Sequence, residues 1–392
     1  MRHVVIAGAV RTPIGRFGGG LASLTAVDLG VIAAREALER AGLEPSAVDE
    51  TVFGCARQAG LGPNVARQVS YRAGVPAERP AFTVNMACGS GLKAIDLAFR
   101  AVRDGDAEVV LAGGTESMSR VPYLLTEARW GHRLGDHVAV DAMVQDGFLC
   151  PLAQQLMGET AETLAGMYEV SRDEQDRYAF ESQRRAAAAQ GEGRLDTETV
   201  AVTVPAKGGP ETVRRDEHPR ATSLESLARL APVFKNDGTV TAGNSSGITD
   251  GAAAMVVLSE ERAAALSVRP LARLAGIATA GVEPRLMGLG VVPAVRAVLA
   301  RVGRALDAFD LVEVNEAFAA QVLACDRELH FDRERLNVNG GAIALGHPIG
   351  ASGARIVVTL LRELARRRQR WGLASLCVSG GMGLAAACES LS

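Results

Sequence analysis

The chain contains an internal duplication, and this repeat limits the folds that it can adopt. One pattern is an amphipathic helix that stops at glycine and leads into a strand through aspartate; the other is a Ser-Gly start followed by a helix and an apolar strand. The first occurs at residues 33–54 and 294–315, and the second at 90–114 and 352–381. Helices that alternate with nearly continuous apolar strands predict parallel strands covered on both faces. We therefore expect an α/β fold of two pseudo-symmetric halves, with sites where their central strands converge.

A segment of different character separates the two copies, from about residue 119 to 249. Residues 120–133 have no clear period, Ser171 followed by acidic residues predicts a capped helix start, and 200–215 reads as paired strands around Lys207-Gly-Gly. We interpret this segment as an insertion with its own small core. It could supply a wall of a substrate site or a surface for oligomerisation.

Composition and charge exclude several classes of partner. The chain has 392 residues, 48% of them hydrophobic, and a formal net charge of -3. A net charge of this sign and size gives no excess of basic residues, which binding to nucleic acid or to an anionic membrane would need. We therefore expect neither as a partner, and expect a small-molecule substrate instead. No run reaches the roughly 18 apolar residues of a membrane span. Residues 1–11 predict a strand that runs into an Arg-Thr-Pro turn rather than a targeting peptide, so we expect a cytoplasmic protein.

The six cysteines have no spacing typical of a disulfide framework or a metal site. They are scattered, with no CxxC pair and no Cys/His ligand pattern. We therefore expect free thiols and no metal. Two of them, Cys88 and Cys377, and also His347, lie where an apolar run breaks into glycine. Glycine-rich turns allow close backbone approach and can direct a side chain and several N–H groups into one small space.

Each of these residues has a chemical interpretation and a structural alternative. Cys88 precedes a helix that begins near Ser90, where the helix dipole would lower the thiol pKa; it could instead be an inert buried cysteine. His347 could accept a thiol proton near neutral pH, or be a loop histidine with satisfied hydrogen bonds. Cys377 could be a core residue of an apolar strand. Asn315 ends the other duplicated strand and could hold a water or an oxygen, or simply form a turn.

Taken together, the motifs closely resemble the thiolase family. One of them is the long run from Asn337 to Gly353, which contains Gly-His-Pro-Ile-Gly-Ala-Ser-Gly. The matching stretches appear in order over the whole chain: 11–15, 85–94, 112–119, 157–162, 241–247, 315–319, 337–353 and 377–383. The resemblance implies a thiolase-like five-layered α/β/α/β/α fold and a homo-oligomer, either a dimer or a dimer of dimers (a homotetramer). It also implies an N-terminal half over 1–261, which contains the inserted loop domain at about 119–249, and a C-terminal half over 269–392.

The resemblance also implies a mechanism for these residues. Cys88 would attack an acyl-CoA thioester after giving its proton to His347, and would release CoA from an acyl-enzyme in a ping-pong cycle. Cys377 would then remove an α-proton from a second acetyl-CoA. The enolate oxygen would be stabilised by His347 and a water held by Asn315, and the acyl oxygen by the backbone amides of Cys88 and Ser379.

Coenzyme A and acyl-CoA enter this scheme as substrates, and no cofactor is expected to be bound permanently. Residues that match family positions for coenzyme A contacts lie in the insertion and beyond it. They are Arg220, Ser226, Phe234, Ala242 and Ser246, with Met157 and Phe318 at the pantetheine end.

Two departures from the family pattern bear on activity and on chain length. Ser379 replaces a glycine that usually donates an oxyanion-hole amide, and Leu156 replaces a histidine that many acetoacetyl-forming members carry. The leading hypothesis is an acetyl-CoA C-acetyltransferase of fatty acid metabolism, which condenses two acetyl-CoA to acetoacetyl-CoA. One alternative is a degradative 3-ketoacyl-CoA thiolase acting on longer or dicarboxylic chains. The other is a non-catalytic subunit that binds CoA or acyl groups.

Overall fold

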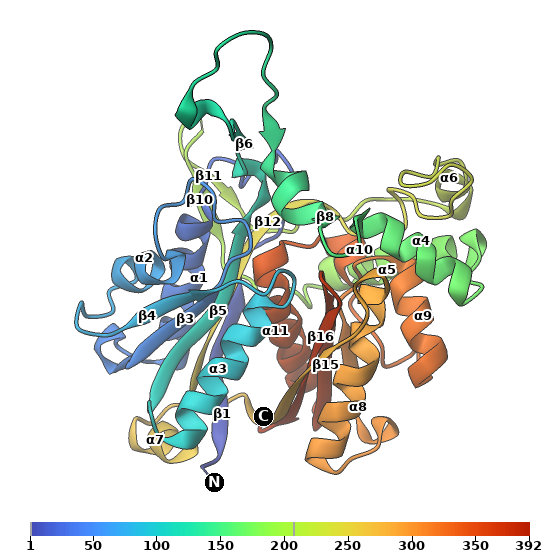
Figure 1. Cartoon of the computed structure of the whole chain (residues 1–392). Helices are drawn as coiled ribbons and strands as arrows, with labels where there is room; N and C mark the ends of the chain where they lie inside the picture. The colour runs from blue at the N-terminus through green and yellow to red at the C-terminus, as the bar shows by residue number, and fades with distance from the viewer. Residues whose placement is uncertain (1, 207) are drawn as a thin grey trace.

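Two helices lie side by side at the centre of the fold, between the two halves of the chain (Figure 1). They are α3 (Ser90–Asp104) and α11 (Ile349–Arg367), and the computed structural model that contains them describes residues 2–206 and 208–392. Their backbones approach closely because each contributes a glycine to the crossing. A Cβ on Gly353 would lie 2.4 Å from the backbone nitrogen of Leu92, and a Cβ on Gly91 would lie 2.8 Å from that of Ala354. The duplicated Ser-Gly pairs therefore mark the contact between the two halves.

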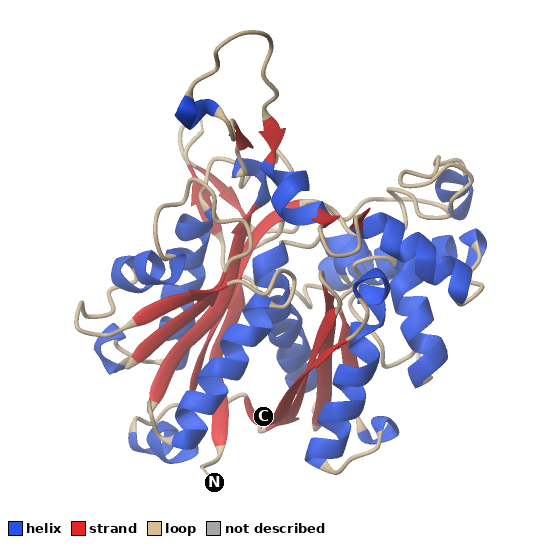
Figure 2. Ribbon diagram, viewed as in Figure 1, coloured by secondary structure: helices blue, strands red, loops and turns tan. Residues whose placement is uncertain are grey.

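The strands flank these helices on both sides (Figure 2). Nine of them form one hydrogen-bonded path in the order β14, β15, β16, β13, β1, β12, β5, β3, β4, and β2 adds to β12. Their bounds are β1 (Val4–Arg11), β2 (Gly15–Arg16), β3 (Glu50–Gly54), β4 (Ala81–Val84), β5 (Val109–Ser117), β12 (Thr249–Ser259), β13 (Ala272–Gly281), β14 (Leu311–Val314), β15 (Trp371–Val378) and β16 (Met382–Ser390). β1 and β13 join the halves through only two residue pairs.

The expectation of wholly parallel sheets is wrong. β3, β4 and β5 are parallel, and so are β14 and β15, but β1, β12, β13 and β16 all pair antiparallel with their neighbours. The physical reason is that a strand covered by helices on both faces is apolar along its whole length, whatever its direction. Burial therefore determined the sequence pattern, and strand direction left no separate trace in it.

Helices cover the outer faces and complete five layers, as the predicted fold class requires. α1 (Ala26–Ala41) and α2 (Val65–Arg72) pack on the N-terminal side, and α8 (Val291–Val302) packs with α9 (Ala319–Leu329) on the C-terminal side. The duplicated helices α1 and α8 both end at a left-handed glycine, Gly42 and Gly303. These two caps confirm that the glycines seen in the repeat terminate helices.

The insertion contains its own short elements. α5 (Arg172–Gly191) begins at a capping box between Ser171 and Glu174, as predicted. The expected paired strands are β10 (Val202–Val204) and β11 (Glu211–Val213), and Lys207 of their turn lies outside the described residues. The remaining elements used below are α4 (Met157–Met167), α6 (Leu224–Ala228), α10 (Ala342–Leu345) and the short strands β6 (Tyr123–Leu124) and β7 (Val140–Asp141). A loop between β6 and β7 stands away from the body of the molecule (Figure 1).

Candidate active site

Cys88 lies in the turn that leads from β4 into α3. The residue before it, Ala87, has a φ of 44°, a left-handed conformation that costs roughly 1–2 kcal/mol for a residue with a side chain. Ser90 holds this turn, because its hydroxyl donates to the carbonyl of Ala87 at 2.7 Å and accepts from the N–H of Met86 at 2.8 Å. The turn leaves Cys88 half-buried on the wall of a cavity.

The expected low pKa of Cys88 is not found. Burial raises the pKa of this thiol above its ordinary value, although the charge of Arg57 and the backbone amides of Ser379 and Cys88 act in the opposite direction. The helix effect is weaker than expected because α3 begins two residues later, at Ser90. A low-dielectric setting penalises the thiolate more than these groups stabilise it. The thiol therefore needs a neighbouring base.

His347 is positioned to be that base by the junction between α10 and α11. The preceding Gly346 has a φ of 101°, and a Cβ there would lie 2.3 Å from the side chain of Thr249. Nδ1 of His347 lies 2.5 Å from the hydroxyl oxygen of Ser352, and that hydroxyl donates to the carbonyl of Pro348 at 2.9 Å. Since the hydroxyl has only one proton, we assign the ring proton to Nδ1, which leaves Nε2 unprotonated.

The imidazole is neutral in this environment. Burial, together with the charges of Arg355 and Arg57, lowers the pKa of His347 to about 3. Nε2 is buried and has no hydrogen-bond partner among the described residues, and His347 lines the same cavity as Cys88. A neutral ring with a free lone pair, on a residue that lines the cavity, can accept a proton from a thiol.

Cys377 approaches the cavity from the C-terminal half, near the end of β15. Its side chain is 1% exposed, and burial, with smaller contributions from the neighbouring thiols of Cys88 and Cys325, raises its pKa well above the ordinary value. The following turn places Ser379 on the cavity wall as well. Once formed, the thiolate of Cys377 is therefore a strong base.

One cavity of about 730 Å³ collects most of the predicted site residues. Its wall contains both predicted cysteines, His347 and Ser379, and most of the predicted coenzyme A contacts: Arg220, Phe234, Ala242, Ser246, Met157 and Phe318. Phe234 and Phe318 meet edge to face, with ring centroids 6.1 Å apart. Leu156 also lies on the wall, so this part of it is apolar.

Two predicted residues do not line this cavity. Ser226 is exposed on α6, where its hydroxyl pairs with that of Ser223 at 3.2 Å. Asn315 is fully buried just after β14, and its backbone N–H donates to the carbonyl of Ser375 at 2.9 Å. Neither polar atom of its side chain has a hydrogen-bond partner within residues 2–206 and 208–392. Such a buried amide remains available for a water or a substrate oxygen.

Two buried glutamates support the site and were not singled out in the sequence. Glu116 lies at the end of β5 and accepts hydrogen bonds from the backbone of Ala56, Arg57 and Gly350 at 2.8–3.1 Å. It therefore fixes the first turn of α11, which follows His347, against the N-terminal half. Its place in the Gly-Gly-Thr-Glu stretch was the available signal.

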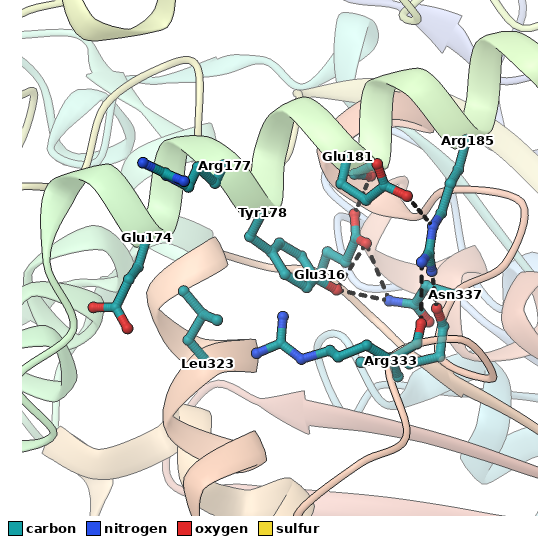
Figure 3. Close-up of a pocket in the computed structure, with 11 residues that line it drawn as sticks. Glu174, Arg177, Tyr178, Glu181, Arg185, Glu316, Leu323, Arg333 and Asn337 are labelled. Carbon is teal, nitrogen blue, oxygen red and sulfur yellow. Dashed lines mark hydrogen bonds and ion pairs between the residues drawn. The ribbon is translucent and has the colours of Figure 1, made fainter. Parts of the chain in front are cut away.

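Glu316 forms the second support, shown in Figure 3. Its carboxylate accepts hydrogen bonds from the hydroxyls of Tyr178 and Ser182 on α5, at 3.0 and 2.7 Å. It also accepts from the side chain of Asn337 and the backbone N–H of Ile343, each at 3.1 Å. Glu316 directly follows Asn315 in the loop after β14. Its hydrogen bonds thus connect this loop to the insertion and to the segment before His347.

The described part of the chain offers no metal site of ordinary composition and no candidate membrane span. No group of three or more His, Cys, Asp or Glu side chains within it is arranged to hold an ion. None of the helices in that part is both long and apolar enough to cross a bilayer.

Comparison with known proteins agrees with the fold and with the resemblance found in the sequence. The Thiolase N-terminal domain model matches residues 4–261 and the Thiolase C-terminal domain model matches 268–390. An acetyl-CoA acetyltransferase from Syntrophomonas wolfei is 49% identical, with both chains fully covered. The crystal structure of the Bacillus anthracis acetyl-CoA acetyltransferase matches with a TM-score of 0.98, 46% identity and coverage of 100% and 99%. Human mitochondrial 3-ketoacyl-CoA thiolase in complex with CoA matches with a TM-score of 0.96, 43% identity and coverage of 100% and 98%.

Proposed function

This chain belongs to the thiolase family, and we propose that it is an acetyl-CoA C-acetyltransferase that condenses two acetyl-CoA to acetoacetyl-CoA and CoA, reversibly. The observation that carries the proposal is the convergence of two thiols and one neutral imidazole on a single cavity. Two relatives named acetyl-CoA acetyltransferase support it, because they are 49% and 50% identical in sequence over 100% and 99% of this chain.

The first half-reaction uses Cys88 and His347. Because burial raises the pKa of Cys88, the thiol transfers its proton to the free Nε2 of His347 as it attacks the thioester carbon. The oxyanion that forms is stabilised by the backbone N–H groups of Cys88 and Ser379. CoA leaves as the thiol with the proton from His347, and the acetyl group remains on Cys88.

The second half-reaction uses Cys377. Cys377 gives its thiol proton to the neutral His347, and the thiolate that forms removes an α-proton from a second acetyl-CoA; the raised pKa of Cys377 makes this base strong enough for a weakly acidic C–H bond. His347 and a water held by Asn315 stabilise the enolate oxygen. The carbanion attacks the acetyl carbon on Cys88 and acetoacetyl-CoA is released, while the departing thiolate of Cys88 takes the proton from His347 and Cys377 keeps the α-proton; thiolysis follows the same steps backward.

CoA would enter between the insertion and the C-terminal half. Support comes from Arg220, whose guanidinium donates to the carbonyl of Ala242 at 3.2 Å on the same cavity wall. Met157, Phe234 and Phe318 would contact the pantetheine arm. Ser226 remains a candidate for the outer part of CoA, since it is exposed on α6 of the insertion.

The same proposal includes a cytoplasmic homo-oligomer, with an N-terminal half over 1–261 and a C-terminal half over 269–392. Two surfaces support self-association. β4 pairs only with β3 among the described residues and is an open sheet edge. The loop beyond β6 exposes Trp130, Leu134 and Val138 at 85%, 96% and 81%, which is typical of side chains that a partner covers.

A second candidate activity is thiolysis of longer 3-ketoacyl-CoA. It is favoured by Leu156, which lines a large cavity where many short-chain relatives carry histidine. We would measure thiolysis of acetoacetyl-, 3-ketohexanoyl- and 3-ketooctanoyl-CoA by wild type, Cys88→Ala and Leu156→His. Fastest cleavage of acetoacetyl-CoA, abolished in Cys88→Ala, supports the proposal. If the longer chains are cleaved faster by wild type, and Leu156→His reverses this preference, the second candidate is favoured. No turnover of any of the three substrates would contradict both candidates.

A further inference from the structure

The catalytic cavity contains a buried positive charge that the thiolase mechanism does not require. Arg57, in the loop after β3, lines this cavity and is only 7% exposed. Its Nε is buried without a hydrogen-bond partner, and no described residue accepts a hydrogen bond from the guanidinium or pairs with it as a carboxylate. Buried charges are normally paired, so a guanidinium in this position is available to an anion in the cavity.

The chain holds this guanidinium in place without neutralising it by contact. Phe148 lies beneath it, with the guanidinium carbon 5.9 Å from the ring centroid. A Cβ on Gly147 would fall 2.0 Å from Nη2, so the glycine leaves the space that the guanidinium occupies. Two carboxylates are near. Glu116 is engaged by backbone amides, and Asp146 is exposed in a small side cavity that Arg57 also lines.

Arg57 and the expected CoA contacts lie on different structural elements of the cavity. The CoA contacts come from the insertion and the C-terminal half, around Arg220 and Phe318. Arg57 instead lies beside the apolar cluster of Met118, Ile349 and Phe148 that packs against Cys88. A group bound by Arg57 would therefore belong to the acyl part of a substrate whose thioester meets Cys88.

We propose that Arg57 is a specificity-determining residue that binds a carboxylate at the far end of a longer acyl chain, so that among 3-ketoacyl-CoA of equal chain length thiolysis favours the one whose chain ends in a second carboxylate. This inference rests on the proposed thiolase function and refines its substrate class. A guanidinium presents parallel N–H donors that match a carboxylate, and such charge-assisted pairs are the stronger hydrogen bonds of proteins. A methyl-ended chain would leave the same cation buried and unpaired.

The test compares substrates that differ only at the chain end. The six-carbon pair is 3-ketoadipyl-CoA, which ends in a carboxylate, and 3-ketohexanoyl-CoA, which ends in a methyl group; 3-ketosuberyl-CoA and 3-ketooctanoyl-CoA form the eight-carbon pair. The readout is the ratio of kcat/KM for thiolysis, acid over neutral, within each pair. For wild type we expect a ratio of about ten or more in at least one pair.

Three variants assign the effect to the guanidinium. Arg57→Met should lower that ratio at least about tenfold, and Arg57→Lys should retain part of it because the charge remains. Gly147→Ala, which displaces the guanidinium, should lower the ratio in the same direction. Arg220→Met is the matched control: it removes another arginine of the same cavity and should reduce kcat/KM for both members of a pair alike, with the ratio unchanged.

Some results overturn the proposal. The first is a wild-type ratio near one in both pairs. The second is a ratio that does not change in Arg57→Met while the rate of Cys88 alkylation falls, because Arg57 would then act only by activating the thiol. A binding readout separates this failure from failure of the thiolase function. If no thioester is cleaved, adipyl-CoA should still protect Cys88 from iodoacetamide at lower concentration than hexanoyl-CoA does. Equal protection by the two would overturn the role of Arg57.

Discussion

The two halves of the molecule use the same junction, the turn before a central helix, to deliver different chemistry. In the N-terminal half the turn before α3 carries Cys88, and in the C-terminal half the turn before α11 carries His347. The matching serines, Ser90 and Ser352, both donate back to a carbonyl of the turn. Ser90 accepts from a backbone N–H, whereas Ser352 interacts with the imidazole. The serine at this matching position therefore holds a backbone turn in one half and orients an imidazole in the other.

The largest expected difference between the halves comes from removing the reactive side chains. Cys88→Ala should abolish both acetyl transfer and condensation, since no acyl-enzyme can form. Cys377→Ala should retain acetyl transfer but lose about 10²–10⁴-fold in condensation, because only the second step needs its thiolate. Exchange of the methyl protons of acetyl-CoA with deuterated water reports this step. Equal loss of both steps in Cys377→Ala would contradict the division of roles.

Substitution of Ser90 and of Ser352 tests whether these two serines, which occupy matching positions in the two halves, have separate roles. Ser352→Ala removes the partner of Nδ1, so the ring can rotate or change tautomer, and we expect kcat to fall about 10–100-fold. Ser90→Ala should mainly destabilise the fold, by about 1–3 kcal/mol, because a backbone N–H and a carbonyl lose their partner. The measurements are kcat with its pH profile, and urea denaturation. A kcat loss in Ser90→Ala larger than in Ser352→Ala would break the comparison.

The glycines of the central crossing test how closely the halves must pack. Gly353→Ala and Gly91→Ala would each place a methyl group against the facing helix backbone, and we expect about 1–3 kcal/mol of destabilisation from overpacking. Gly166 in α4 has open space around its Cβ position, so Gly166→Ala should stabilise by about 0.5–1 kcal/mol. Thermal denaturation compares the three. Tolerance of both central substitutions without loss of stability would mean that the helices can separate.

The smallest effect concerns the pH dependence of the free thiols. Because the pKa of Cys88 is raised above 9.0, its thiolate fraction should still increase as the pH rises through 9. His347, with a pKa of about 3, stays neutral from pH 5 upward and adds no inflection between pH 5 and 7. Iodoacetamide labelling should therefore accelerate steadily to pH 9.5, and Cys377 should react more slowly because it is buried. A plateau already at pH 7 would show a stabilised thiolate.

The periodic spacing of apolar residues and the positions of glycine at the ends of helices and strands allowed much of this structure to be predicted. The duplicated helices and their glycine caps, the capping box at Ser171 and the hairpin near 202–213 all followed from local patterns. Strand direction did not, because burial on both faces hides it. The shift in the pKa of Cys88 also escaped prediction, since it depends on how much protein surrounds the sulfur rather than on its distance from a helix start.

The buried residues that support the cavity were harder to predict than Cys88, His347 and Cys377, which line it. Glu116 and Glu316 act through partners that are distant in sequence, such as Gly350 and Tyr178, and no local pattern shows those contacts. Arg57 lines a cavity whose wall comes from many separate segments, which no local pattern shows either. The contact of Ser352 was easier to anticipate, because Ser352 lies about one helical turn beyond His347 in the same Gly-His-Pro-Ile-Gly-Ala-Ser-Gly motif. Its bond to Nδ1 still depends on the ring orientation that Gly346 permits.

The central claim, that Cys88 carries the acyl group and Cys377 handles the proton, can be tested directly by mass spectrometry. Wild type and Cys377→Ala are incubated with acetyl-CoA, quenched in acid and digested, and the acetylated cysteine is located by peptide sequencing. The account predicts one acetyl group on Cys88 in both proteins and none on Cys377 of the wild type. Acetylation of Cys377, or loss of the acetyl group from Cys88 when Cys377 is replaced, would contradict it.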